Sequence, residues 1–251
     1  MYLAIARKWR PSRFEDLVGQ GHVVQTLKNS ILQSRVSHAY LFSGARGVGK
    51  TSVARIFAKA LRCAQAVDGT PCNQCDECLA IAESRSMDVV EIDGASNNGV
   101  EAVRAIRDNV AYGAASGKYK IYIIDEVHML SLSAFNALLK TLEEPPAHVV
   151  FIFATTEVQK LPLTILSRCQ KFEFRRLSTQ QITERLKTII DSEKVSIDEE
   201  GMRIIASHGD GSLRDSLSLL DQVLSYFSQG GDQISVTAAQ VVEALGVADT
   251  N

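Results

Sequence analysis

The sequence has little net charge of either sign. It holds 27 lysine and arginine residues against 29 aspartate and glutamate residues, which gives a formal net charge of −2 at pH 7. This near balance excludes a strong basic field that would attract nucleic acid to the whole surface. We therefore expect any contact with DNA to come from local patches or from an assembled oligomer.

The sequence also lacks a long hydrophobic run. The N-terminus reads Met-Tyr-Leu-Ala-Ile-Ala-Arg-Lys, which has no apolar core of the kind found in signal peptides. No apolar stretch reaches membrane-spanning length. We expect a cytoplasmic location and no membrane partner. The composition, with 45% hydrophobic and 22% charged residues, is ordinary for a globular chain of one or two domains.

Cysteine is scarce, and four of the five cysteines gather in one segment. Cys63, Cys72, Cys75 and Cys78 have the spacing C-x8-C-x2-C-x2-C. Cytoplasmic thiols stay reduced, and four sulfur ligands suit structural Zn²⁺ with no open position for chemistry. One alternative is an iron–sulfur cluster, although the bacterial ferredoxin spacing would place a further cysteine and a proline shortly after Cys78, and residues 79–83 contain no cysteine. The other alternative is metal-free buried or redox-active thiols. Cys169 stands alone and is expected to be a small buried apolar group.

A glycine-rich segment lies between a predicted strand and a predicted helix. It fits the pattern G-x-x-x-x-G-K-[ST], after an apolar run at residues 39–43 and before apolar residues at helical spacing from 53 to 61. Backbone N–H groups at such a helix start bind phosphate oxygens; the alternative is a glycine-rich turn with a chance lysine. The residues expected to bind the nucleotide here are Gly44, Ala45, Arg46, Gly47, Val48, Gly49, Lys50 and Thr51.

Two further apolar runs end in polar residues. The strand predicted from residue 120 ends at Asp125 and Glu126, which favours Mg²⁺ binding by Asp125 together with Thr51, and orientation or deprotonation of a water by Glu126. The alternative is a solvated acidic turn. The strand predicted from residue 149 ends at Thr155 and Thr156, which would either contact the γ-phosphate or simply cap the strand.

The order of the predicted elements indicates an α/β fold. Further strands are expected at residues 89–93 and 171–174, and helices at 100–110 and 132–143, so the first part should form a parallel five-stranded sheet with flanking helices. From Ser178, whose capping box with Gln181 opens a helix, the pattern is helical to about residue 245, with a last helix capped by Ser235. We predict a nucleotide-binding domain at 1–177, with the cysteine module at 63–78 inserted. A small all-helical lid domain follows at 178–245, and a tail at 246–251.

Several segments together resemble the AAA+ ATPases and, within them, the tau/gamma family of bacterial clamp-loader ATPases that serve DNA polymerase III. The resemblance covers nearly the whole chain. It rests on the four cysteines and on "ARKWRPSRFEDLVGQ", "HAYLFSGARGVGKTS", "VEIDGASNNGVEAVR", "YIIDEVHMLS", "FNALLKTLEEPP", "FIFATTEVQKLPLTILSRC" and "GSLRD".

The resemblance implies roles that spacing alone does not give. Arg168 of "SRC" would be an arginine finger that reaches the ATP site of a neighbouring subunit, where Lys50 and Glu126 are the other catalytic groups. Arg214 of "GSLRD" would contact the γ-phosphate from the lid, and Thr156 would occupy the sensor position on the sheet, with Thr155 beside it. Val18 and Gly19 would line the adenine, and the four cysteines would bind zinc.

The resemblance further implies an ATPase without a polymerase site of its own. ATP binding and hydrolysis would drive the loading of a sliding clamp onto primer–template DNA, in a complex with delta, delta prime and further tau/gamma copies. The related delta prime subunit has a degraded phosphate loop, whereas Gly44, Gly49, Lys50 and Thr51 are all present here. The family continues into a collar domain that holds the pentamer together and that this sequence does not contain.

Two other functions remain open at the level of the sequence. One is a non-catalytic module in which the nucleotide is structural, which the intact Asp125 and Glu126 disfavour. The other is a branch-migration or helicase motor, because Asp-Glu-Val-His at 125–128 superficially resembles such enzymes. The cysteine segment and "SRC" favour the loader, and we expect His128 to be a packing or hydrogen-bonding residue.

Overall fold

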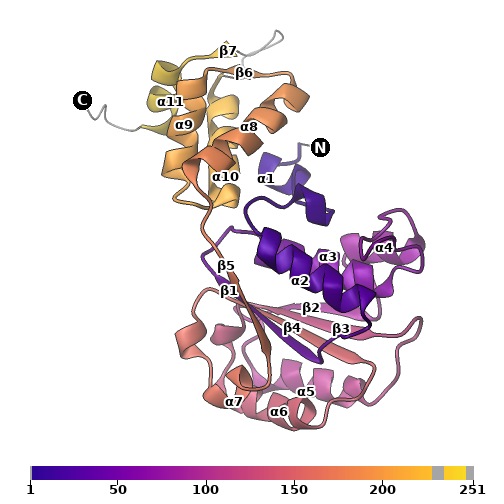
Figure 1. Cartoon of the computed structure of the whole chain (residues 1–251). Coiled ribbons are helices and arrows are strands. Elements are labelled where there is room, and N and C mark those ends of the chain that lie inside the picture. Colours follow the sequence, from indigo (N-terminus) through magenta and orange to yellow (C-terminus); the bar gives the residue numbers. More distant parts are fainter. Residues whose placement is uncertain (1, 228–234, 247–251) are drawn as a thin grey trace. The chain divides into compact units, whose positions relative to one another are not determined.

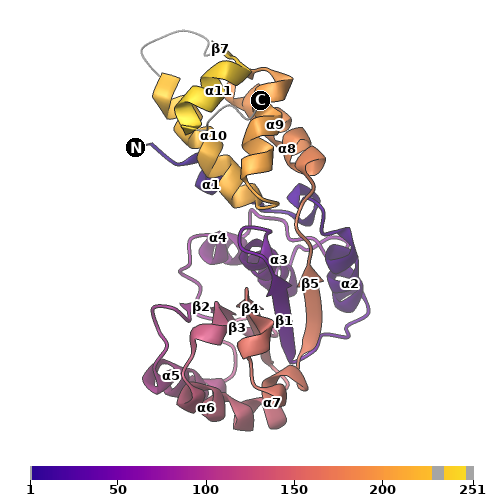
Figure 2. The same cartoon turned by 90° about the vertical axis from the view of Figure 1, so that its left-hand side faces the viewer.

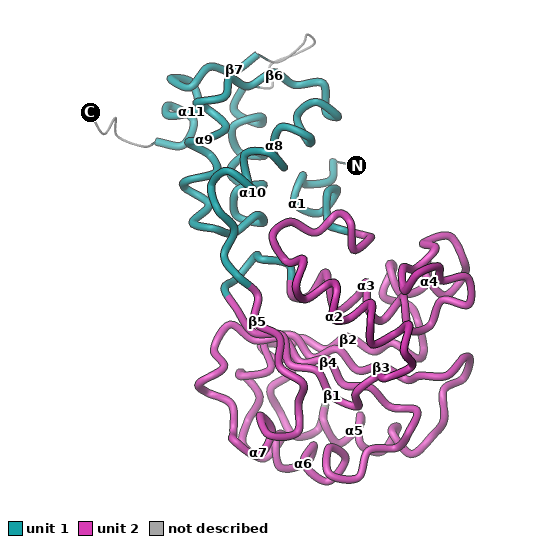
Figure 3. The backbone as a smooth tube through the Cα atoms, viewed as in Figure 1, with its two compact units in different colours: residues 1–11, 45–49, 175–251 teal, residues 12–44, 50–174 magenta. Residues whose placement is uncertain are grey.

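The computed structural model describes residues 2–227 and 235–246. The chain divides into two compact units, shown in teal and magenta in Figure 3. The sheet unit comprises residues 12–44 and 50–174, and the helical unit comprises residues 1–11, 45–49 and 175–251. The N-terminal segment and five loop residues thus group with the C-terminal helices, so the sequential boundary after residue 177 stays a prediction. Among the described residues, no helix is both long and apolar enough to cross a membrane.

The sheet unit contains one parallel five-stranded sheet, as predicted. Its strand order is β2-β3-β4-β1-β5, so consecutive strands along the chain are connected by crossovers. The register pairs Ser43 with Thr155 and Asp93 with Asp125, which places the carboxyl ends of these strands at one edge of the sheet. The strands are β1 Ala39–Gly44, β2 Val89–Asp93, β3 Lys120–Asp125, β4 Val149–Thr155 and β5 Gln170–Phe174.

Helices cover both faces of this sheet because each has one apolar face to bury. One face carries α2 Gly21–Leu32, α3 Lys50–Arg62 and α4 Asp76–Ala82. The other face carries α5 Val100–Val110, α6 Leu132–Glu143 and α7 Leu163–Leu166. Figures 1 and 2 show the two groups of helices on opposite faces. Short 3-10 turns complete the unit: η1 Phe14–Asp16, η2 Val127–Met129 and η3 Val158–Lys160.

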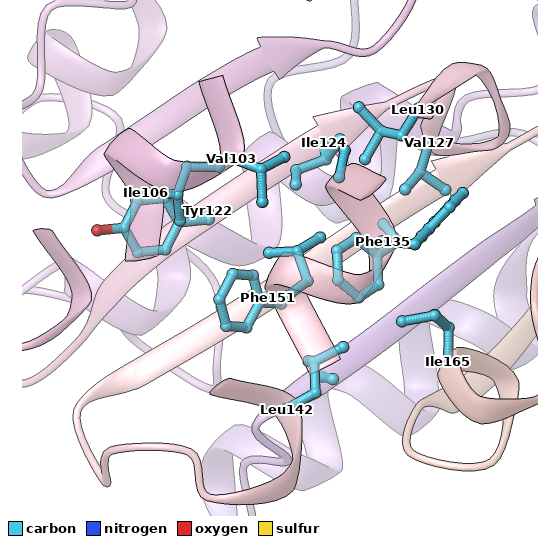
Figure 4. Packing of buried hydrophobic residues seen from close by; sticks show 14 of the residues in the cluster. Val103, Ile106, Tyr122, Ile124, Val127, Leu130, Phe135, Leu142, Phe151 and Ile165 are labelled. Atoms are coloured by element: carbon cyan, nitrogen blue, oxygen red, sulfur yellow. The ribbon is translucent and has the colours of Figure 1, made fainter. Parts of the chain in front are cut away.

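The core on the second of these faces combines strand residues such as Tyr122 and Phe151 with helix residues such as Val103 of α5, Phe135 of α6 and Ile165 of α7 (Figure 4). Every residue of β4 is buried, because a central parallel strand is covered on both faces. The rings of Tyr122 and Phe151 stack with their centroids 5.5 Å apart. Truncating a ring such as Phe151 would cost about 3–5 kcal/mol. Cys169 packs against this core as an apolar group but is only half-buried, and its burial raises the pKa of its thiol to about 12.

The helical unit is nearly but not wholly helical. The capping box of Ser178 and Gln181 is present as predicted. The predicted cap at Ser235 is wrong, because Ser235 belongs to a two-residue strand, β7 Ser235–Val236, which pairs with β6 Ser196–Ile197. Thr237 caps the last helix instead. The helices are α1 Ile5–Lys8, α8 Thr179–Glu193, α9 Glu199–His208, α10 Leu213–Phe227 and α11 Ala238–Leu245.

The first and last helices of the described chain are held or ended by specific residues. Helix α1 packs against α10. Next to it, Trp9 donates its indole N–H to Glu193, with 2.7 Å between the nitrogen and the carboxylate oxygen. Gly246 ends α11 in the left-handed conformation that favours glycine. Of the predicted tail at 246–251, residues 247–251 lie outside the described residues.

Candidate functional site

The glycine-rich segment forms the predicted loop between β1 and α3. Three of its backbone positions have positive φ angles that side chains with a Cβ rarely adopt: Gly44, Gly47 and Gly49. Lys50 is the first residue of α3 and is 5% exposed, and its Nζ donates to the carbonyl of Gly44 over 2.8 Å. Burial lowers the pKa of Lys50, while attraction to Glu126 and Asp125 opposes that shift. The lysine therefore lies across the start of the loop, near two carboxylates.

The two residues predicted to hold magnesium lie in direct contact. The hydroxyl of Thr51 donates to Oδ2 of Asp125 over 2.6 Å. The other carboxylate oxygen of Asp125 accepts from the backbone N–H of Glu126 over 3.0 Å. Hydroxyl and carboxylate oxygens are the hard ligands that Mg²⁺ takes in proteins beside substrate phosphates. The donor set at the end of β3 and the start of α3 therefore fits this ion.

The side chain of Glu126 is hydrogen-bonded to Thr156, directly after the neighbouring strand β4. Its backbone is left-handed, with φ 45° and ψ 47°. Its Oε2 accepts from the hydroxyl of Thr156 over 3.0 Å and from the backbone N–H of Thr156 over 3.3 Å. The same oxygen lies 3.4 Å from Nδ1 of His128. The structure thus brings the predicted sensor residue Thr156 onto the predicted general base.

The two threonines at the end of β4 have different surroundings. Thr155 is fully buried, and its hydroxyl oxygen lies 2.9 Å from Nδ1 of His128. The Thr155 hydroxyl also accepts from the backbone N–H of Glu157 over 3.0 Å, which is strand-end capping. Nε2 of His128 lies 3.3 Å from Glu157. His128 is therefore the packing and hydrogen-bonding residue that the sequence predicted, although its partners could not be named from the sequence.

Gly94 is a residue of this site that the sequence analysis missed. Its backbone N–H donates to the carbonyl of Asp125 over 2.8 Å. A Cβ at this position would lie 2.7 Å from the carbonyl oxygen of Glu126, which is closer than real Cβ contacts. Only glycine lets the end of β2 approach the acidic end of β3. The signal in the sequence was a glycine directly after the strand that ends at Asp93.

In the helical unit, loop residues contact the start of α10. A Cβ on Gly47 would lie 1.9 Å from the hydroxyl of Ser212 and 3.1 Å from Cβ of Arg214. The backbone N–H of Arg214 donates to the carbonyl of Gly47 over 3.4 Å. Arg214 itself is exposed. The structure thus brings the predicted lid arginine beside residues of the phosphate loop that belong to the same unit.

Three other predicted residues lie elsewhere in the sheet unit. Arg168 follows α7 and pairs with Glu143 at the end of α6, with Nη2 and Oε1 2.8 Å apart. Val18 is half-buried, and Gly19 is exposed with a positive φ angle, in the segment before α2. Among the described residues, the polar contacts of the acidic strand end involve none of these three. Their predicted roles stay predictions.

The four predicted zinc ligands form a compact cluster between the end of α3 and α4. The sulfur atoms of Cys63, Cys72, Cys75 and Cys78 all lie within 4.8 Å of one another, and those of Cys63 and Cys75 are 3.9 Å apart. Tetrahedral zinc with Zn–S bonds of about 2.3 Å needs sulfurs about 3.8 Å apart, so the residues fit the ion. Backbone N–H groups of Gln74 and Cys75 lower the pKa of Cys72 to about 6. Burial raises the pKa of Cys63 and of Cys78.

Two buried cations, also missed by the sequence analysis, connect this cluster to the rest of the sheet unit. Lys59 of α3 is 5% exposed, and its Nζ donates to the carbonyl of Ser12 over 2.9 Å and to the side chain of Asn73 in the cysteine segment. The side chain of Arg62 is 1% exposed and pairs with Glu77 of α4 over 2.6 Å and with Asp88 before β2 over 2.8 Å. Removing one partner of such a buried pair costs about 3–5 kcal/mol. These contacts fix the cysteine segment against α3 and the sheet.

Comparison with known proteins assigns the chain to a family. The sequence profile described as "DNA polymerase III, delta subunit" matches residues 19–178. A second profile, described as "DNA polymerase III clamp loader subunit, ATPase lid domain", matches residues 181–230. The first match alone spans more than half of the chain.

Curated relatives match at high identity. "DNA polymerase III subunit tau" of Bacillus subtilis is 55% identical over 241 residues, which cover 96% of this chain and 42% of the relative. "DNA polymerase III subunit tau" of Escherichia coli is 50% identical over 248 residues, which cover 99% of this chain and 38% of the relative. The chain thus spans about two fifths of the length of these relatives.

A solved structure shares the fold. The Thermotoga maritima RuvB Holliday junction branch migration motor superposes with a TM-score of 0.70 at 20% identity, covering 97% of this chain and 74% of that chain. At such identity the likeness shows the AAA+ type of fold alone, and it leaves the choice of function to the family matches. The chain therefore belongs to the family of bacterial DNA polymerase III clamp-loader subunits, and it is similar to those named tau and gamma.

Proposed function

We propose that the chain binds and hydrolyses ATP as part of a clamp-loader subunit. The observation that carries this proposal is the acidic end of β3, where Asp125 contacts Thr51 and Glu126 is held by Thr156. In-line attack of water on a γ-phosphate requires a phosphate loop, groups that hold Mg²⁺ and a group that orients the water. The loop with Thr51, the carboxylates of Asp125 and Glu126, and Thr156 directly after the adjacent strand are groups of these kinds. The high identity to tau subunits supports the same conclusion.

Each residue in this arrangement has a specific task. The backbone N–H groups of residues 44–51 would hold the phosphates, and Lys50 would neutralise the charge on the β- and γ-phosphates. Thr51 and Asp125 would hold Mg²⁺, which supplies charge neutralisation at the phosphate oxygens when it is bound. Glu126 would orient or deprotonate the attacking water.

Three further residues complete the proposed site. Thr156 would fix the carboxylate of Glu126 or contact the γ-phosphate. Arg214, beside the loop residue Gly47, would contact the γ-phosphate. Arg168 would act on ATP bound to a neighbouring subunit, where it would stabilise the charge of the transition state. Val18 and Gly19 are proposed to line the adenine.

We also propose the larger context. Within the complete subunit, the ATP-bound state would hold the sliding clamp and primer–template DNA together with the delta, delta prime and further tau/gamma subunits, and hydrolysis would weaken that hold. The balanced charge of the chain fits DNA binding shared among several subunits. The zinc cluster would be structural, because all four ligand positions are protein thiolates. The cytoplasm, where replication subunits work, is the proposed location.

The experiment that tests this proposal is Glu126→Gln in the complete subunit, assembled with its partners. The amide keeps the size of the side chain but cannot act as a base, so ATP turnover should fall at least about 100-fold while ATP still binds. Glu144→Gln serves as the matched control, because Glu144 is an exposed carboxylate after α6 and should leave turnover unchanged. Turnover that survives Glu126→Gln would instead favour a nucleotide-binding scaffold, and strand separation by the protein would favour a motor.

A further inference from the structure

The guanidinium group of Arg168 is held by acceptors of its own chain. Nη1 donates to the carbonyl of Thr164 over 2.6 Å and to the hydroxyl of Ser167 over 3.3 Å. Nη2 donates to Oε1 of Glu143 over 2.8 Å. Thr164 belongs to α7, one turn before the arginine, whereas Glu143 is the last residue of α6. The arginine thus has one anchor within its own turn and one ionic anchor on another helix.

These two anchors differ in charge and in what can replace them. The carbonyl of Thr164 is neutral and fixed in the backbone, so it sets the direction of the side chain. Glu143 provides a carboxylate, and a phosphoryl group is a more highly charged acceptor for the same N–H groups. A phosphate from outside could therefore replace the carboxylate while the contact with Thr164 remains.

The ion pair is exposed enough to exchange. The side chain of Arg168 is 31% exposed and that of Glu143 is 51% exposed. Ion pairs at this degree of exposure change an equilibrium by a factor of about five at most, because water and salt screen them. The contact is weak enough for a triphosphate to displace, and strong enough to bias where the guanidinium lies.

We propose that Glu143 is a positioning residue that holds Arg168 on its own subunit and competes with the γ-phosphate of a neighbouring subunit for it. This inference rests on the proposed function, in which Arg168 acts in trans. The competition lowers the rate of hydrolysis while the two subunits do not form a closed interface. Arg168 leaves Glu143 and binds the γ-phosphate only when the interface brings that phosphate within hydrogen-bonding distance.

The test is ATP turnover by the complete assembled complex, without and with primed DNA. Glu143→Gln keeps a polar side chain of the same length but removes the competing charge. We expect the DNA-independent kcat to rise about two- to five-fold, with the Kd for ATP and the melting temperature unchanged. Glu144→Gln removes the same charge one residue further along and should leave every parameter as in the wild type.

The double variant separates this inference from the proposed function. If Arg168→Ala does not slow hydrolysis in the complex, the proposed action in trans fails. If Arg168→Ala slows hydrolysis but Glu143→Gln leaves kcat unchanged or lowers it, only the competition is overturned. Glu143→Gln added to Arg168→Ala should have no effect, and a rise in that background would also overturn it, because Glu143 would then act through another group.

Discussion

Glu126 occupies a backbone conformation that most residues avoid. The left-handed conformation costs a residue with a Cβ about 1–2 kcal/mol. At Glu126 this cost is offset by contacts that its side chain and its backbone make with neighbouring segments. Two donors of Thr156 hold its carboxylate, and the backbone of Gly94 approaches its carbonyl oxygen. The conformation directs the carboxylate toward the end of β4 and away from the continuation of β3. The position of the proposed base therefore depends on a glycine that directly follows another strand, β2.

Gly94→Ala should disturb this position. The added Cβ would meet the carbonyl oxygens of Glu126 and Asp125 at 2.7 and 3.0 Å, so the end of β3 must shift. We expect a loss of about 1–3 kcal/mol in the free energy of unfolding and at least a tenfold loss of ATP turnover. Chemical denaturation and steady-state ATPase assays measure the two effects.

Gly113→Ala is the matched control for that substitution. A Cβ at Gly113 would have no heavy atom within 4 Å, so the same change of residue should be tolerated in both assays. Equal behaviour of the two alanine variants would show that the close approach of Gly94 does not position Glu126.

At the residue scale, the sequence predicted groups that lie within a local pattern and missed groups defined by strand register. Lys50, Thr51, Asp125 and Glu126 follow from a loop motif and a strand end, and the structure brings them together. The contact of Glu126 with Thr156 depends on β3 pairing with β4, which no local pattern specifies. Lys59 and Arg62 were missed because a lysine or arginine on a helix is normally exposed.

Among the elements, α3 connects the two chemical sites of the sheet unit. It begins at Lys50 in the phosphate loop and ends at Arg62, directly before the predicted zinc ligand Cys63. Thirteen helical residues span about 20 Å. The buried Lys59 and Arg62 on its last turns fix the cysteine segment, so that segment supports the C-terminal end of the helix whose N-terminal end forms the loop.

Removal of the metal should therefore destabilise the chain more than it weakens ATP binding. We expect one zinc per chain in freshly purified reduced protein, and Cys72→Ser should lose it. The melting temperature should fall by roughly 5–15 °C, because a lost structural metal costs several kcal/mol and 1 kcal/mol corresponds to about 2–4 °C at this size. The Kd for ATP should change by less than about threefold.

Elemental analysis and thermal melts test this prediction. Cys169→Ala, which removes the cysteine outside the cluster, should keep the zinc. Protein that contains no zinc before any substitution would contradict the four-thiolate site.

The five strands of the sheet and the helices α3, α5 and α6 were predictable from their apolar patterns, whereas α1, α2, α4 and α7 were not predicted. The strands β3 and β4 are continuous buried apolar runs, whereas β2 and β5 alternate buried with more exposed residues. The helices α3, α5 and α6 each show one apolar face. The error at Ser235 has a non-local cause. Ser235 pairs with Ser196, 39 positions earlier in the chain, so a residue that looks like a helix cap is drawn into a strand.

For the whole molecule, the boundary between the two units runs through the phosphate loop. Gly44, Lys50 and Thr51 are part of the sheet unit, whereas residues 45–49 are part of the helical unit. The phosphate loop is thus the segment where the chain passes from one unit into the other and back. The sequence predicted both parts but placed a single boundary between them, since a pattern along the chain does not show that residues 45–49 group with distant helices.

Isothermal calorimetry with Mg²⁺ and a non-hydrolysable ATP analogue tests the central claim most directly. We predict one binding site per chain in the wild type and at least about 100-fold weaker binding in Lys50→Ala, because the loop loses its charge-assisted contacts with the phosphates. Lys118→Ala, a lysine in the segment before β3, should bind as the wild type does. A wild-type chain that is folded by circular dichroism but gives no binding heat at any temperature, and no shift in melting temperature, would contradict the account.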